Sequence, residues 1–91
     1  MLVGMYAIYD VKAGSYMSPF TLATDGMAKR AFINEMRRPD SLIGSSPSDF
    51  SLVKLGSFDD VAGTVSSDDP LDGACLLNGD EARYLMEEEG K

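Results

Sequence analysis

The sequence predicts a small α+β domain with its elements in the order β-β-α-β-β. One main helix covers a small antiparallel sheet, and an acidic C-terminal extension follows. Three observations predict this fold class. Residues 2–11 are apolar at almost every position, residues 28–36 carry apolar side chains at helical spacing, and carboxylates gather after residue 58. At 91 residues the chain is one domain with a small core, because a chain of this length buries only about 60–65% of the surface that it exposes when unfolded.

The first strand is predicted at residues 2–11, where both faces are apolar. One face carries Val3, Met5, Ala7 and Tyr9, and the other carries Leu2, Tyr6 and Ile8. A strand with two apolar faces lies centrally in a sheet. Residues 12–15 (KAGS) form a glycine turn, and residues 19–24 form a second short strand that pairs antiparallel with the first.

The main helix is predicted at about residues 25–38. Thr24 or Asp25 is its N-cap, and Pro39 stops it because a residue before proline avoids helical geometry. One apolar stripe, which packs Phe32 on the sheet, consists of Ala28, Ala31, Phe32 and Met36. The opposite face is polar and basic, with Lys29, Arg30, Asn34, Arg37 and Arg38.

Residues 40–48 are predicted as a loop, residues 49–58 as a strand, residues 59–63 as a turn and residues 64–67 as a returning strand. Phe50 and Leu52 share one face of the longer strand, and Val53 and Leu55 share the other.

Two alternatives are open for the end of the chain: a strand at residues 74–77, or a terminal helix at 81–89 capped by Asp80. The helix is favoured, with a frayed acidic end. We therefore divide the chain into a core domain, 1–63, and an acidic segment, 64–91.

The composition argues against an enzyme. The chain has no histidine and one cysteine, Cys75, so a Ser-His or Cys-His nucleophile pair, a disulfide within the chain and a cysteine-based zinc site are all excluded. Neither a glycine-rich phosphate loop nor a calcium-loop motif is present. We expect no catalytic residue, no metal ligand and no cofactor, and we expect Cys75 to be buried as a small apolar side chain.

Charge divides the chain unevenly. Residues 1–58 carry six basic against five acidic side chains, whereas residues 59–91 carry two against ten, and the net charge of the chain is −7. The simplest interpretation is that the acidic end is a solvated surface without a partner. The alternative is that the acidic end imitates nucleic acid and competes for a basic surface on a partner or on the protein's own helix.

Aromatic and basic residues together suggest a surface for single-stranded nucleic acid, although the same tyrosines would also serve an ordinary core. Tyr6 and Tyr9 are three apart, so they point to opposite faces of a strand. If the helix covers the Tyr6 face, Tyr9 remains available for stacking on bases. The candidate nucleic-acid-binding residues are Tyr9, Lys12, Tyr16, Lys29, Arg30, Arg37 and Arg38.

A resemblance adds a biological setting. The stretches YAIYDVKAGSYMSPF (6–20), TDGMAKRAF (24–32) and PSDFSLVKLGSFDDVAG (47–63) resemble the small non-structural protein of gokushoviruses, which are single-stranded DNA bacteriophages of the Microviridae. The resemblance implies a protein made inside the infected bacterium and absent from the virion. By analogy with other microviruses, it implies a role at the change from duplex replication to single-strand synthesis and packaging.

These observations lead to two hypotheses of function. In the first, the protein is a non-catalytic accessory protein that binds single-stranded DNA; in the second, it is an adaptor whose acidic end engages a basic viral or host protein. We expect a homodimer, since one helix covers only one face of the sheet. The expected location is the host cytoplasm, without a signal peptide or membrane contact, because the apolar N-terminus has no basic residue and meets Asp10.

Overall fold

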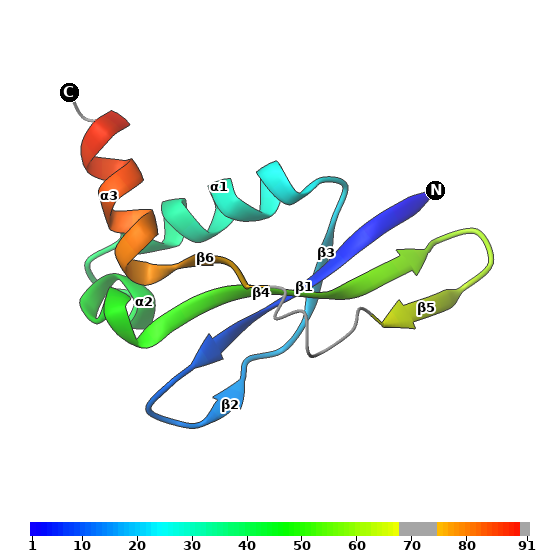
Figure 1. The fold of residues 1–91 in the computed structure, drawn as a ribbon, viewed down its shortest axis with the longest axis horizontal. Helices are drawn as coiled ribbons and strands as arrows, with labels where there is room; N and C mark the ends of the chain where they lie inside the picture. The colour runs from blue at the N-terminus through cyan, green and yellow to red at the C-terminus, as the bar shows by residue number, and fades with distance from the viewer. Residues whose placement is uncertain (68–74, 90–91) are drawn as a thin grey trace.

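An antiparallel sheet of six strands forms one layer of the structure, and one long helix lies across it (Figure 1). The computed structural model describes residues 1–67 and 75–89. The elements are β1 (Leu2–Asp10), β2 (Ser15–Tyr16), β3 (Phe20–Leu22), α1 (Asp25–Met36), α2 (Leu42–Ser45), η1 (Pro47–Asp49), β4 (Phe50–Asp59), β5 (Thr64–Ser67), β6 (Cys75–Asn78) and α3 (Gly79–Glu89). The predicted α+β class, with an antiparallel sheet and a main helix, is confirmed.

The strands β1 and β4 form the centre of the sheet. They pair with each other along nearly their whole length, with β2 and β3 on the free side of β1 and β5 and β6 on the free side of β4. The apolar first strand is therefore central, as predicted. Met5 pairs with Gly56 while Tyr6 pairs with Lys54, so Leu55 is one extra residue in β4 and forms a β-bulge.

Helix α1 begins where the sequence predicts. The Thr24 hydroxyl accepts a hydrogen bond from the Met27 amide at 3.2 Å, and this cap starts the helix. Phe32 and Met36 are buried against the sheet, as predicted, but Ala31 is exposed and Ile33 is buried instead. The difference arises because α3 also packs on α1, so the buried stripe is displaced toward Ile33 and away from Ala31, which lines a cavity.

The segment at 40–48, predicted as a loop, contains the short helix α2 and leads into the 3-10 turn η1. Ser41 explains the change of direction after α1. Its hydroxyl lies 2.9 Å from the carbonyl oxygen of Glu35, near the end of α1, and accepts a hydrogen bond from the Gly44 amide at 2.8 Å. Ile43 is buried in the core, which anchors α2 beneath α1.

The end of the chain realises both predicted alternatives, because β6 is followed directly by α3. The predicted cap, Asp80, is wrong: the Asn78 side chain accepts a hydrogen bond from the Glu81 amide at 2.8 Å and donates one to the Glu81 carboxylate at 2.6 Å. Asn78 is therefore the N-cap of α3, and the Glu81 carboxylate binds its side-chain amide rather than the backbone N–H that a capping box would use. Leu77 and Ala82 belong to the core, which thus crosses the predicted boundary at residue 63.

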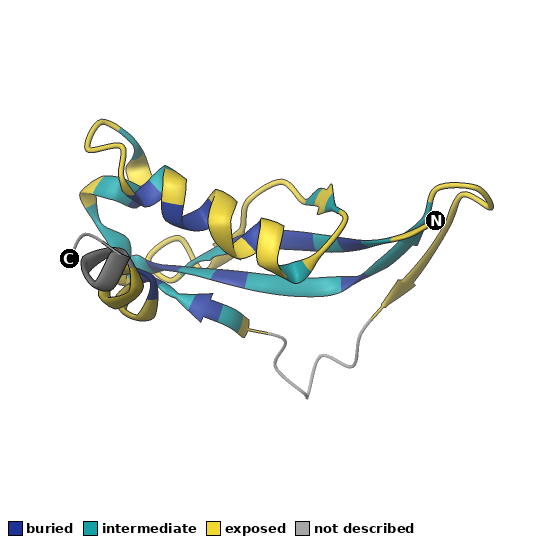
Figure 2. Ribbon diagram, turned by 90° about the horizontal axis from the view of Figure 1, so that it is seen from above, coloured by how far each residue is buried: buried dark blue, intermediate teal, exposed yellow. Residues whose placement is uncertain are grey.

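Figure 2 shows that β2, β5 and most connecting segments are exposed, while buried positions lie on β1, β4 and α1. Cys75 is exposed, contrary to prediction, because it pairs with Val53 on the sheet face that α1 does not cover. Within residues 1–67 and 75–89, no helix is long and apolar enough to cross a membrane. Residues 68–74 and 90–91 of the predicted acidic segment lie outside the described residues.

Candidate nucleic-acid interface

The seven predicted binding residues fall into separate groups. Tyr9 and Tyr16 lie on β1 and β2, with Lys12 in the turn between these strands, whereas the other four basic residues belong to α1 or follow it directly. The side chains of α1 pack on the sheet face that carries Tyr6 and Ile8, which confirms the condition under which Tyr9 faces away from the helix. We call the opposite sheet face, which carries Val3, Met5, Ala7, Tyr9 and their cross-strand partners, the open face.

The open face ends in a pair of tyrosines. Tyr9 and Tyr16 are direct cross-strand partners, and their ring centroids lie 4.8 Å apart with the ring planes inclined at 58°. Tyr16 is 56% exposed, so one side of this ring pair is accessible to a ligand. Planar nucleobases stack on such rings, and the interaction is tolerant of base sequence.

A tight turn holds the two rings together. The Asp10 carboxylate accepts hydrogen bonds from the amides of Lys12 and Ala13, at 3.0 and 3.2 Å. Gly14 has φ of +67°, a conformation that favours glycine, and its amide donates to the Asp10 carbonyl at 2.8 Å. This turn sets the register that places Tyr16 opposite Tyr9.

Lys12 is the cation nearest in sequence to the tyrosine pair. Its ammonium group lies 3.8 Å from a carboxylate oxygen of Asp49 and is largely solvated, so the ion pair is weak. A phosphate that approached the tyrosines could replace Asp49 as the partner of Lys12 at little cost. One cation, however, attracts only one phosphate.

The basic residues of α1 form a second, separate feature. Lys29, Arg30 and Arg37 line a hollow of about 460 Å³ along the helix, together with Asn34 and Ile33. Arg38 does not line this hollow, and its guanidinium instead lies 3.3 Å from Glu35 and 3.9 Å from Asp40. The hollow is suited to an anionic group by its charge.

The hollow on α1 and the tyrosine pair lie on different sides of the sheet. One short oligonucleotide therefore cannot contact both groups along a straight path. The sequence indicated both groups by residue type, but sequence spacing carries no information on which layer of the fold a residue joins. The structure thus pairs Tyr9 with Tyr16 and places Lys12 in the turn that joins their strands, with its ammonium group near Asp49. The cations of α1 lie apart from all three residues.

Sequence reasoning missed a polar cluster at the start of α1. The buried Tyr6 hydroxyl donates a hydrogen bond to the Asp25 carboxylate at 2.7 Å, and the Lys54 ammonium lies 3.1 Å from the same oxygen. Burial, followed by the interaction with Asp25, raises the pKa of Tyr6 to about 12. The hydrogen bonds from Tyr6 and Lys54 lower the pKa of Asp25.

This cluster is suited to holding the fold rather than to proton transfer. A carboxylate with a lowered pKa is a weak base, and a tyrosine with a raised pKa is a weak acid. The three residues join β1, α1 and β4, which are far apart in sequence, so no local pattern could have revealed them.

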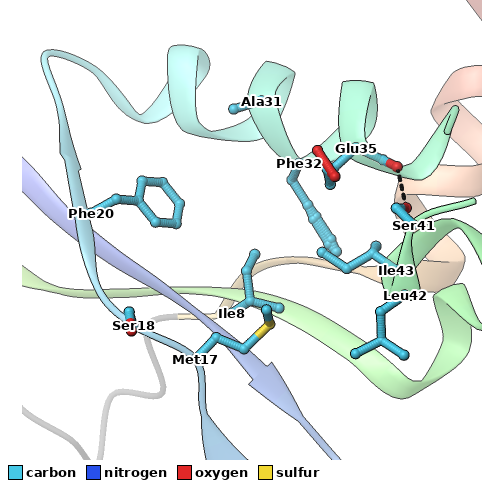
Figure 3. A pocket seen from close by; sticks show the side chains of 10 residues that line it. All are labelled: Ile8, Met17, Ser18, Phe20, Ala31, Phe32, Glu35, Ser41, Leu42 and Ile43. Atoms are coloured by element: carbon cyan, nitrogen blue, oxygen red, sulfur yellow. Dashed lines mark hydrogen bonds between the residues drawn. The ribbon is translucent and has the colours of Figure 1, made fainter.

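An apolar cavity of about 490 Å³ lies on the other flank of α1 (Figure 3). Ile8, Phe20 and Phe32 contribute its apolar lining, with Met17 and Leu42 nearer the solvent. Glu35 is the one charged residue among its described lining residues. The cavity can accept an apolar group, but its lining does not suit a phosphate.

Comparison with known proteins gives one positive result. The sequence profile of a family described as Phage ORF5 protein matches residues 3–81. This range includes all of β1 except its first residue, the other described strands and the first part of α3. Comparisons with curated proteins and with solved structures give no match. Because the match extends over most of the chain, this protein belongs to the phage ORF5 protein family.

Proposed function

We propose that this phage protein is a non-catalytic accessory protein that binds single-stranded DNA weakly in the cytoplasm of the infected bacterium. The observation that carries the proposal is the Tyr9–Tyr16 ring pair on the open face, in which Tyr16 is exposed and Tyr9 half-buried, with Lys12 in the adjoining turn. The resemblance to the non-structural protein of gokushoviruses supports a role in genome replication or packaging, where single-stranded DNA is the product. The absence of histidine from the sequence supports a non-catalytic role.

The expected stacking free energy and the charges of the protein explain why the binding is weak. Stacking on an aromatic side chain contributes about 1–3 kcal/mol per base. The turn beside the tyrosines supplies one cation, Lys12, which already has Asp49 as a partner, and the net charge of −7 repels the phosphates of a long strand. Stacking therefore supplies most of the affinity, and binding depends only slightly on salt compared with a site that neutralises many phosphates.

Replacing Tyr16 by alanine is expected to weaken binding of a short oligothymidine by about fivefold or more, since about 1 kcal/mol of stacking corresponds to this factor. Fluorescence anisotropy at low salt measures the affinity. Tyr84→Ala is the matched control, because Tyr84 is 62% exposed but lies on α3, away from the open face. Equal affinities of Tyr16→Ala and wild type, with both proteins folded, would contradict the proposed site.

The adaptor hypothesis is a second candidate, and the charge distribution favours it. Ten of the fifteen carboxylate side chains follow residue 58, and a basic partner would be attracted to them. The same anisotropy assay with a labelled oligolysine peptide separates the two hypotheses. The adaptor requires tight peptide binding that Tyr16→Ala leaves unchanged, together with no binding of the oligonucleotide.

A further inference from the structure

Among the described residues, the open face carries no charged side chain. It carries the odd-numbered residues 3–9 of β1 and their direct partners on the neighbouring strands, and none of these residues is charged. One transverse row consists of Val3, Phe58 and Val65, on β1, β4 and β5. Val65 is 60% exposed, so this row is accessible at its edge.

The three described helices all lie away from this face. Side chains of α1, α2 and α3, among them Phe32, Ile43 and Ala82, belong to one core cluster with Tyr6 and Ile8 on the covered side of the sheet. Among the described residues, no helix packs on the open face. Within residues 1–67 and 75–89, apolar side chains on the open face are therefore shielded only by their neighbours in the sheet.

We propose that the open face is the interface of a symmetric homodimer, in which two copies pack open face to open face. The lack of charge on the open face favours a second copy of the chain over other partners. A nucleic-acid backbone or a basic protein would find no opposite charge across most of the face, whereas a second copy offers the same neutral apolar surface. Two chains of net charge −7 repel each other elsewhere, so an uncharged face is where they can approach closely.

The size of the face sets the strength of the dimer. Alternate residues of a strand are about 6.8 Å apart and neighbouring strands about 4.8 Å apart, so four rows over three to four strands cover on the order of 500 Å² per copy. The total buried area, on the order of 1,000 Å², lies at the lower limit for a specific interface. We therefore expect a dimer with a dissociation constant in the micromolar range.

Sedimentation equilibrium of the full chain, without DNA, tests this proposal. From about 5 µM to about 500 µM, the mean mass should rise from the 9.8 kDa of one chain toward twice that value. Val65→Lys should weaken the dimer at least about thirtyfold, because each dimer would then bury two unpaired ammonium groups. Val61→Lys is the matched control: it adds the same charge at a position that is 86% exposed in the turn between β4 and β5.

Cys75 provides an independent readout on the same face. It is the one cysteine of the chain and is exposed, so its alkylation by a neutral maleimide should slow as the protein concentration rises. This dependence should disappear in Val65→Lys and persist in Val61→Lys. A monomer at the highest concentration, or equal dimerisation of the two lysine variants, would overturn the proposal. Because no DNA is present, neither result tests base stacking on Tyr9 and Tyr16, which is measured separately on monomeric protein.

Discussion

Replacing Phe32 by alanine is expected to lower the free energy of unfolding by about 3–5 kcal/mol. Phe32 is buried between α1 and the sheet and also lines the apolar cavity beneath the helix. Removal of its ring would enlarge an existing cavity rather than allow the core to close. Since a domain of this size is stable by only roughly 5–14 kcal/mol, most of the folded population should be lost on mild heating.

Urea unfolding followed by circular dichroism measures this effect. Met27→Ala is the matched control, because Met27 lies on the same helix and is 50% exposed. Its effect should stay within about 0.5 kcal/mol. A melting temperature of Phe32→Ala within a few degrees of wild type would contradict the packing of α1 on the sheet.

The second large effect is a loss of stability at alkaline pH through Tyr6. The pKa of Tyr6 is about 12 in the folded protein against an ordinary value of 10.0. Below pH 10 the Tyr6 phenol is protonated in both the folded and the unfolded protein. Between pH 10 and 12 it ionises in the unfolded chain but stays protonated in the folded protein, so the free energy of unfolding falls as the pH rises. Two pKa units correspond to about 2.7 kcal/mol, which is the expected size of this decrease.

Comparison with Tyr6→Phe isolates the contribution of Tyr6. The variant lacks the phenol, so its stability curve should omit this alkaline decrease, while at neutral pH it should lose about 1–2 kcal/mol because Asp25 loses a hydrogen bond. Tyr16→Phe serves as the control and should retain the decrease. Parallel stability curves for wild type and Tyr6→Phe from pH 8 to about pH 11.5 would show that Tyr6 is not held in this environment.

Much of the fold could be predicted because its determinants are local. The alternation of Tyr6 and Tyr9 placed them on opposite faces, and the spacing of Ala28, Phe32 and Met36 placed the apolar stripe of α1. Its residue type identified Thr24 as one of two candidates for the N-cap of α1. Each of these inferences depends on residues that are neighbours in sequence.

The errors concern contacts between distant segments. Ile33 is buried rather than Ala31 because α3 returns to pack on α1, and Cys75 is exposed because β6 joins the sheet with that side chain on the open face. Neither outcome follows from local periodicity. Asn78 rather than Asp80 caps α3 because the helix begins earlier, directly at the end of β6.

The arrangement of the candidate site residues in the fold could be inferred from the sequence only in part. The pairing of Tyr9 with Tyr16 follows from a tight glycine turn, so a sequence signal for it exists. No comparable sequence signal shows that these tyrosines lie on the opposite side of the sheet from the cations of α1. Residues in a helix and in the strand beneath it can be close in sequence and still face opposite sides of the sheet.

The most direct test of the proposed DNA site is a titration of the Val65→Lys variant, in which the dimer is expected to be at least about thirtyfold weaker, with a short oligothymidine, followed by amide NMR chemical shifts. Binding to the open face predicts the largest changes at Tyr9, Lys12 and Tyr16, with α1 almost unaffected. Changes confined to Lys29, Arg30 and Arg37, or no changes at all, would contradict the proposal that the tyrosine pair binds single-stranded DNA.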